Sequence, residues 1–402
     1  MIQTAPASYN LTPTLLSGIS KYRNAAAFFG LLGVLACIAG WVMEPAQFYR
    51  SYLVGYFFWF GISLGSLALL MVQHLSGGAW GMVIRRILEA SSRTLPFMAV
   101  LFIPILFGIP ALYEWDDAAK VAHDVVLQNK QTYLNAPFWI SRVVIYFLIW
   151  NFLMYRLNKW SKQEDAEGGT KYAISMEKLS AAGIIIYVFT MTFAVTDWIM
   201  SLAPHWFSTI FGFLTVVSQG LSTFAFSVAV LVLLASQTPM AEVVTKKHLH
   251  DLGKLMLAFV MLWAYMSFSQ LLIIWAGNLP EEISWYLARL NNGWGWVAAG
   301  LLLFHFIVPF LLLLSQSIKR NPRTITMVAI WIIFIRIVDV FWLIEPNFNR
   351  TSFNLSWLDI AAPIGVGGIF VALFLMELPK RALMPAGAPD LQKALAHGRH
   401  TH

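Results

Sequence analysis

The chain has 402 residues, of which 58% are hydrophobic and only 12% are charged, and its mean hydropathy is +0.67. A soluble chain carries about a quarter charged residues, so this composition excludes a soluble multidomain protein, a disordered chain and a coiled coil. The single cysteine, Cys37, excludes a disulfide, a CxxCH haem attachment, a Cys-ligated zinc site and a Cys-held iron–sulfur cluster. If this chain takes part in a redox reaction, a partner subunit must therefore hold the metal centres.

Ten stretches are long and apolar enough to predict transmembrane helices, each needing about 20 mostly apolar residues. They lie at 25–43, 51–74, 94–113, 137–157, 180–203, 208–236, 251–277, 294–315, 324–344 and 357–377. We therefore expect an all-α, polytopic membrane protein.

The distribution of positive charge predicts the orientation of these spans. Of the 27 Lys and Arg residues, 18 fall in the segments on the side of both termini and five in the alternate segments. The positive-inside rule then places both termini in the cytoplasm, for which a bacterial inner membrane is the expected setting. The net charge of +7 is explained by this topology, so nucleic-acid binding is not expected.

The order of the spans suggests two four-helix bundles, at 51–203 and 204–344. Peripheral helices would flank them within 25–50 and 345–377. The remaining segments, 1–24 and 378–402, are expected to be cytoplasmic. No loop is long enough for an independent domain, so functional groups must lie in the membrane or on partner subunits.

Four ionisable residues are expected at the outer end of the first bundle: Glu114, Arg142, Asp197 and His205. A charge inside an apolar span is costly, so it requires a partner, a watery cavity or a function. One interpretation is a structural Arg142–Asp197 ion pair. The other is a quinol site in which Asp197 and His205 accept protons, Arg142 orients the ring and Glu114 is the proton exit.

Aromatic residues accompany these charges at the same expected depth. Tyr52, Tyr56 and Trp59 follow one helical stripe, and Trp139 lies nearby. They could belong to an interfacial aromatic belt or form the walls of a quinone pocket.

A second set of ionisable groups lies in the spans of the second bundle. Arg336 and Asp339 are three residues apart and can neutralise each other on one helix face. His305 and Glu345 could extend this pair into a proton path, although a lone histidine within the membrane is more often a packing residue. No second histidine matches His305 in depth, so a bis-His haem is not expected.

A polar stripe that includes Ser218 and Ser222 crosses the span 208–236. It could be a helix-packing surface or the wall of a proton half-channel, with an entrance near His74 and Glu377.

Small residues and prolines predict where helices approach or bend. Gly61 and Gly65 form a GxxxG motif that favours close helix packing. Pro104, Pro110 and Pro309 free backbone groups and can kink their helices.

Longer strings resemble NrfD-like, polysulfide-reductase-type membrane subunits, most closely the ActF-type second subunit of alternative complex III. They are SYLVGYFFWFGISLGSLALLMVQHLSGGAWG at 51–81, TDWIMSLAPHWFSTIFG at 196–212, LWAYMSFSQLLIIWAGNLPEE at 262–282, HFIVPFLLLLSQSIKRNP at 305–322 and RIVDVFWLIEP at 336–346.

The resemblance implies ten helices in two bundles and membership of a quinol:cytochrome c oxidoreductase. It implies menaquinone or ubiquinone as ligand and no haem, iron–sulfur cluster or other metal bound by this chain. The implied partners are a sister NrfD-like subunit, a periplasmic iron–sulfur and molybdopterin-type subunit, multihaem and monohaem cytochromes c, and lipids. The sister subunit could hold the productive quinol site.

Three alternatives remain open from the sequence. The chain could conduct protons without its own quinone site, it could be a structural anchor, or it could be a secondary transporter. Against a transporter, no matched pair of broken helices is evident in the two halves.

Overall fold

A computed structural model describes residues 9–399, and these residues form helices connected by short segments, with no strand among them. Ten helical segments within this range are long and apolar enough to cross a membrane, which confirms the expected fold class. They are Pro13–Met43, Pro45–Ser76, Ala79–Phe107, Ala136–Glu167, Lys171–Leu202, Phe211–Leu234, Lys246–Gly277, Trp294–Leu314, Pro322–Asn347 and Leu358–Lys380.

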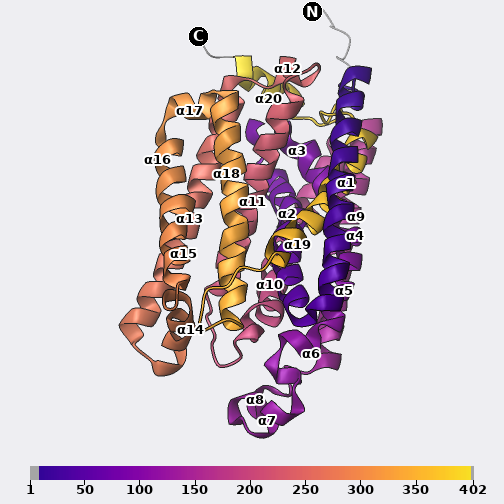
Figure 1. Cartoon of the computed structure of the whole chain (residues 1–402). Coiled ribbons are helices and arrows are strands. Elements are labelled where there is room, and N and C mark those ends of the chain that lie inside the picture. Colours follow the sequence, from indigo (N-terminus) through magenta and orange to yellow (C-terminus); the bar gives the residue numbers. More distant parts are fainter. Residues whose placement is uncertain (1–8, 400–402) are drawn as a thin grey trace, which may run out of the picture.

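The long helices run nearly parallel in one layered bundle, and both ends of the described chain lie at the same end of it (Figure 1). A backbone hydrogen bond from Leu383 to Tyr9, at 2.9 Å, joins the two terminal segments there. We call this the terminal end and the other the distal end. The expected cytoplasmic segments 1–24 and 378–402 include residues 1–8 and 400–402, which lie outside the described residues.

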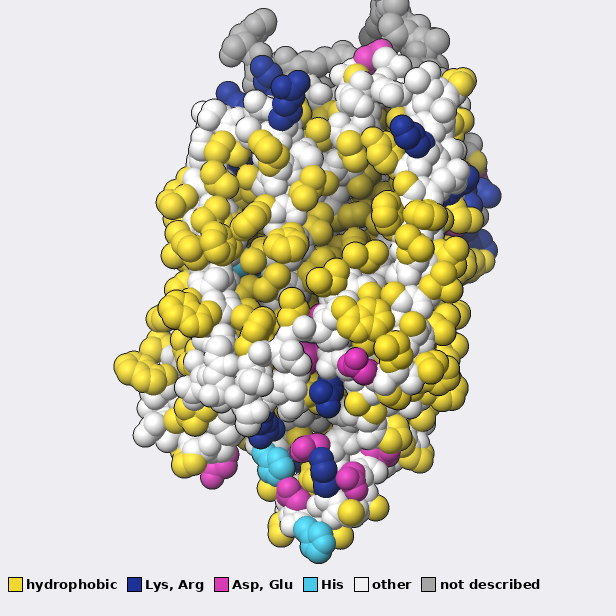
Figure 2. Space-filling model, viewed as in Figure 1, with side chains coloured by type: hydrophobic (Ala, Val, Ile, Leu, Met, Phe, Trp, Pro, Cys, Tyr) yellow, Lys and Arg dark blue, Asp and Glu magenta, His cyan; other side chains and the backbone are white. Residues whose placement is uncertain are grey.

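The surface carries an apolar middle zone between two charged ends (Figure 2). On the face in view, most Lys and Arg side chains lie towards the terminal end, whereas most acidic and histidine side chains, with some further Lys and Arg, lie towards the distal end. This is the pattern that a membrane-spanning protein needs, because charged groups are costly in the hydrocarbon layer.

Caps and prolines explain where several long helices begin and end. Thr12 caps α1 (Pro13–Met43) by accepting from the Leu15 amide, and Pro45 at the first turn of α2 (Pro45–Ser76) separates the two helices. Asn278 adopts a left-handed conformation that ends α13 (Lys246–Gly277).

Helices α2 and α11 (Phe211–Leu234) are the most enclosed spans. α2 packs against α10 (Lys171–Trp198), α11, α18 (Pro322–Ile344) and α19 (Leu358–Glu377). A Cβ at Gly65 would lie 2.5 Å from Thr223 Oγ1, and one at Gly61 would lie 3.3 Å from Gln219. The GxxxG motif is therefore a close packing surface between α2 and α11, as predicted.

The third span begins at Ala79, so the predicted start at residue 94 is wrong. Residues Ala79–Ser92 form helix α3, which is almost wholly buried. The chain then continues through α4 (Leu95–Leu101), α5 (Ile103–Phe107) and α6 (Ile109–Leu112), short helices that each begin beside a proline. The irregularity expected at Pro104 and Pro110 is present as breaks between these short helices.

The segments between the remaining spans hold short helices as well. At the distal end, α9 (Ala136–Glu167) is preceded by η1 (Glu114–Asp116), α7 (Ala118–Ala122) and α8 (Val125–Lys130). At the same end, η2 (Met200–Leu202) follows α10, and α14 (Pro280–Leu290) follows α13. The other short elements are α12 (Met240–Val243), α17 (Gln316–Arg320), η4 (Glu345–Asn347), η5 (Leu378–Lys380) and α20 (Leu391–Arg399).

The eighth span contains a change of helical geometry. It runs through α15 (Trp294–Leu301), a π-helical turn η3 (Leu302–Ile307) and α16 (Val308–Leu314). Pro309, the second residue of α16, lies just after this turn, where the sequence indicated a possible kink. Single π-helical turns often lie at functional sites.

Candidate functional site

A groove of about 600 Å³ lies between α13, α14, α15 and α18. Its size is in the range of small-molecule sites in proteins, about 300–1,000 Å³. Most of its lining is apolar, and its edge includes Phe268 and Leu302, whose side chains are exposed on the apolar surface. The groove therefore opens towards the lipid. Four polar side chains line it: Ser267, Gln270, Tyr286 and Asp339.

Asp339 is the only charged side chain among the residues that line this groove. It forms a buried ion pair with Arg336 on the same face of α18, as its spacing predicted. The indole N–H of Trp263, from α13, donates to Asp339 Oδ2 at 3.3 Å. An acidic group is thus held at the wall of an apolar groove with its charge balanced by one cation.

His305 lies behind Trp263, in the π-helical turn. The two rings meet edge to face with their centroids 3.9 Å apart. The imidazole is completely buried, and neither ring nitrogen has a hydrogen-bond partner within the described residues. His305 therefore adjoins the site through Trp263 and does not contact Asp339 in a recorded hydrogen bond.

Gln270 and Tyr286 line the distal part of the groove, and Ser208 supports Gln270 from outside it. Ser208 donates to Gln270 Oε1 at 2.9 Å, and Gln270 Nε2 donates to the Tyr286 hydroxyl at 3.2 Å. Burial raises the pKa of Tyr286 to about 12, so this phenol stays protonated at neutral pH. It remains available as a hydrogen-bond donor to a ligand oxygen.

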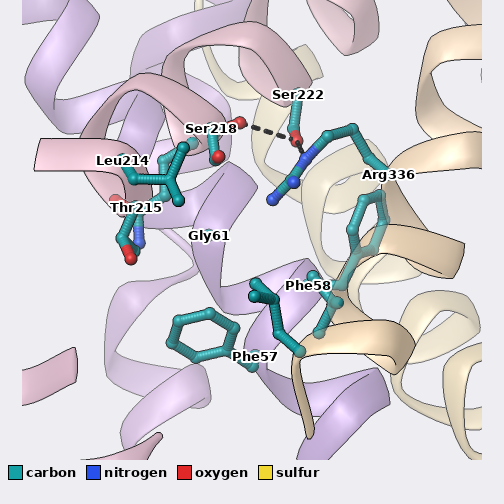
Figure 3. Close-up of a pocket in the computed structure, with 11 residues that line it drawn as sticks. Phe57, Phe58, Gly61, Leu214, Thr215, Ser218, Ser222 and Arg336 are labelled. Atoms are coloured by element: carbon teal, nitrogen blue, oxygen red, sulfur yellow. Dashed lines mark hydrogen bonds between the residues drawn. The ribbon is translucent and has the colours of Figure 1, made fainter. Parts of the chain in front are cut away.

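Arg336 faces the polar stripe of α11 on its other side (Figure 3). Its Nε donates to Ser222 Oγ at 3.4 Å, and Ser222 donates to the Ser218 carbonyl at 3.0 Å. Thr215, Ser218, Ser222 and Arg336 line a small cavity with about 10 Å³ of room, enough for about one water molecule. The ion pair thus connects the lipid-facing groove with a polar pocket inside the bundle.

In the first half of the chain, Arg142 and Asp197 form the ion pair that their depth suggested. Two guanidinium nitrogens of Arg142 each donate to an Asp197 oxygen at 2.9 Å. The Tyr146 hydroxyl donates to the same carboxylate at 2.8 Å, and the Trp139 indole donates to the Asp197 carbonyl at 2.9 Å. Asp197 is fully buried and lines none of the five cavities described for residues 9–399.

The aromatic residues expected to wall a quinone pocket are packed into the interior. Tyr52 donates to the Leu101 carbonyl at 2.7 Å, Tyr56 to the Met98 carbonyl at 2.9 Å and Trp59 to the Pro363 carbonyl at 2.8 Å. Trp59 therefore faces α19, while the two tyrosines hold the broken third span. A lipid-facing hollow of about 440 Å³ lies nearby, but no ionisable side chain lines it.

Glu114 and His205 lie apart from the buried Arg142–Asp197 pair. Glu114 pairs with Lys120 at 3.3 Å, and both side chains are partly exposed. His205 Nε2 lies 2.6 Å from Asp124 Oδ2. Desolvation acts to raise the pKa of Asp124, but hydrogen bonds from the Leu127 amide and from His205 lower it below its usual value. These contacts hold the short distal helices in place.

Glu345 lies away from the Arg336–Asp339 pair and belongs to a separate carboxylate cluster. Gln47 Nε2 lies 3.4 Å from a Glu345 oxygen and 3.3 Å from an Asp359 oxygen. Ser51 donates to the same Asp359 oxygen at 2.5 Å. The cluster joins α2, η4 and the start of α19.

The two residues expected at a proton entrance are separately bonded near the terminal end. His74 Nδ1 lies 3.1 Å from Ser180 Oγ. Glu377 accepts from Arg93 Nε at 2.9 Å and from Lys380 at 2.5 Å. The structure does not bring these two residues together.

A buried charge network at the terminal end was missed by the sequence analysis. Glu89 pairs with Arg85 at 3.1 Å, with Arg86 at 2.6 Å and with Arg381 from the C-terminal segment at 2.9 Å. Glu164 adds a further contact to Arg85 at 2.6 Å. The three- and four-residue spacing of Arg85, Arg86 and Glu89 was the available signal, but the segment was read as a loop.

The described residues contain no group of three or more His, Cys, Asp or Glu side chains that could hold a metal ion. Comparison of the chain with protein-family models and with curated proteins finds no match. A functional assignment therefore depends on the geometry of the groove and on the resemblance of the quoted segments.

Proposed function

We propose that this chain is a membrane subunit of a quinol oxidoreductase and that it binds quinol in the groove beside Asp339. The observation that carries the proposal is a single carboxylate on the wall of an apolar, lipid-facing groove of about 600 Å³. A quinol needs such a site, because its ring and tail are apolar while its two hydroxyl groups must form hydrogen bonds and lose protons.

The groove offers groups for both ends of a quinol ring. Asp339 can accept a proton from one hydroxyl, and the Trp263 indole and the Arg336 guanidinium hold that carboxylate in position. Tyr286 and Gln270, in the distal part of the groove, are suited to the opposite oxygen. Trp263, Trp285 and Trp342 supply aromatic surface for the ring.

Oxidation of one quinol gives one quinone, two protons and two electrons. The first proton passes to Asp339, and the second leaves through the same carboxylate after it has released the first. Both electrons pass to a redox centre on a partner subunit. By the resemblance of the quoted segments, that partner is an iron–sulfur protein or a cytochrome c at the distal end, and a sister NrfD-like subunit lies beside this chain in a bacterial inner membrane.

This proposal moves the proton acceptor from Asp197 to Asp339. Both Asp197 oxygens are occupied by Arg142 and Tyr146, so this carboxylate is suited to holding α9 and α10 together. Asp339 is balanced by Arg336 and lies on the wall of a groove that opens to the lipid. A membrane-soluble substrate requires such an opening to reach its proton acceptor.

A matched pair of substitutions tests the location. Ala298 lines the groove, and Ala99 lines the other lipid-facing hollow. We expect Ala298→Trp to abolish saturable binding of a short-chain ubiquinone or menaquinone to the purified full-length protein, and Ala99→Trp to leave it unchanged. Loss of binding only in Ala99→Trp, or unchanged binding in both, would contradict the proposal.

A second candidate function is proton conduction without a quinone site, and the polar pocket between Arg336 and the α11 serines favours it. In that case Asp339→Asn would stop proton translocation by the assembled complex while quinol oxidation continued. If Asp339→Asn stops both, the quinol site is favoured.

A further inference from the structure

A second hollow, of about 230 Å³, lies at the distal end and is distinct from the quinol groove. We call it the Arg289 hollow. Its walls come from the segment after α10, from α14 and from the segment after α18. Trp285 is common to both sites, because its side chain lines the hollow and the groove. The hollow therefore adjoins the lipid-facing groove.

Arg289 is the central charge of this hollow, and its side chain is only 1% exposed. Its terminal nitrogens donate to the Trp285 carbonyl at 3.1 Å, the Leu343 carbonyl at 2.7 Å and Asn347 Oδ1 at 2.9 Å. The guanidinium carbon lies 3.6 Å from the centroid of the Trp285 ring. These contacts fix the position of the guanidinium but supply no negative charge.

The buried charge of Arg289 has no acidic partner within residues 9–399. No ion pair to it is recorded there, and its Nε is buried without a hydrogen-bond partner. Burial lowers the pKa of Arg289 well below its usual value, and the nearby Arg350 acts in the same direction. An uncompensated buried cation costs several kcal/mol, so an anion that neutralises it would be bound favourably.

The other ionisable side chains that line the hollow are also basic residues. Arg350 and His205 line the hollow with Arg289, and no Asp or Glu is among its lining residues. His205 is engaged by Asp124 from outside the lining, whereas the exposed Arg350 side chain has no recorded ion pair within the described chain. Arg289 and Arg350 can thus both contact one ligand. The planar guanidinium of arginine is well suited to bidentate hydrogen bonding with phosphate oxygens.

We infer that the Arg289 hollow is a binding site for a phosphate group. The proximity of the lipid-facing groove suits the phosphate of an anionic lipid headgroup, whose acyl chains would lie along the apolar surface. Inorganic phosphate carries the same chemistry and could reach the hollow from the aqueous side. This inference does not rest on the quinol proposal, because the hollow shares only Trp285 with the groove and neither Asp339 nor Gln270 lines it.

The test uses the full-length protein in a phosphate-free neutral detergent and two probes. One is dihexanoyl-phosphatidylglycerol below its micellar concentration, and the other is sodium phosphate, with sodium chloride at matched ionic strength as reference. Binding is measured by calorimetry, together with the thermal unfolding midpoint. We expect saturable binding of at least one probe and a rise in the unfolding midpoint that chloride does not produce.

Variants at the two ends of the molecule make the result specific. Arg350→Gln should weaken binding about three- to fivefold, as for an exposed charge, and Arg289→Gln should weaken it at least about thirtyfold, as for a buried one. Arg323→Gln removes an exposed arginine at the terminal end and should have no effect.

The outcomes distinguish a lipid-headgroup site, an inorganic-phosphate site and the absence of a phosphate site. Tighter binding of the lipid identifies a headgroup site, and tighter binding of inorganic phosphate identifies a free-anion site. The inference is wrong if neither probe binds the unmodified protein more tightly than chloride does. It is also wrong if Arg350→Gln and a folded Arg289→Gln both bind the probes with the affinity of the unmodified protein. Quinone binding is not measured, so this result does not depend on the quinol proposal.

Discussion

The indole N–H of Trp263 donates to Asp339 across 3.3 Å, and the same ring meets the edge of His305 at a centroid distance of 3.9 Å. Trp263 therefore couples the position of the acidic group in the groove to the π-helical turn of the eighth span. A substitution at any of these three residues should alter the geometry of the carboxylate.

Asp339→Asn should lower quinol oxidation by the assembled complex by about 10²–10⁴-fold, because the amide cannot accept the proton that a positioned base removes. The substitution also leaves the buried Arg336 without its counter-charge, so both measurements use protein shown to be folded. In that protein quinone binding should change much less than turnover, since the shape of the groove is preserved. Turnover with a soluble acceptor and equilibrium quinone binding, measured on the same preparation, check this. Equal losses of binding and turnover would indicate a structural role for Asp339.

Asp197→Asn should destabilise the protein by about 3–5 kcal/mol, because it leaves the buried Arg142 guanidinium without its counter-charge. Glu114→Gln is the matched control. It breaks an exposed pair with Lys120 and should cost about 0–1 kcal/mol. Thermal unfolding in detergent measures both. Equal unfolding midpoints for the two variants would refute the structural role assigned to Asp197.

The sequence predicted two buried ion pairs, Arg336–Asp339 and Arg142–Asp197, but not the groove. Arg336 and Asp339 share a helix face by spacing alone, and Arg142 and Asp197 share a depth, so periodicity and span direction were sufficient. The groove depends on α14, a short helix in a segment read as a loop, whose Trp285 and Tyr286 fold back against α13 and α18. Such a tertiary contact leaves no periodic signal.

The start of the third span was misplaced for a related reason. Arg85 and Arg86 lower the hydropathy of this segment, so it did not resemble part of a span. The segment is nevertheless helical and buried, because Glu89 and Glu164 neutralise the two arginines. Charge pairing between distant segments is not visible in hydropathy.

Tyr286→Phe should weaken quinone binding a fewfold and leave its pH dependence between pH 6 and 9 unchanged. The pKa of this phenol is about 12, above its usual value of about 10, so it does not ionise in that range. Because the folded-state pKa is raised, its contribution to stability is complete below about pH 10 and is lost as the pH rises towards 12. The variant should therefore lose less stability than the unmodified protein between pH 10 and 12. Binding and unfolding titrations check this, and identical alkaline unfolding of both proteins would contradict it.

Gly33→Leu should separate α1 from α19 and destabilise the protein by about 1–3 kcal/mol, because a Cβ at this position would lie 2.4 Å from the Gly365 backbone. Gly18→Ala in the same helix is the control, since no atom lies within 4 Å of its added Cβ. Unfolding midpoints in detergent compare the two. A Gly33→Leu midpoint no lower than that of Gly18→Ala would show that the helices are not in close contact.

The most direct test of the quinol site is photoaffinity labelling of the full-length membrane protein with an azidoquinone, followed by peptide mass spectrometry. We predict that label is found on groove-lining residues of 263–271 and 298–306, or on Tyr286 or Leu290, and that excess unlabelled quinone removes it. Label confined to 143–151, which lines the other lipid-facing hollow, or label that unlabelled quinone does not displace, would contradict the assignment of quinol to the groove beside Asp339.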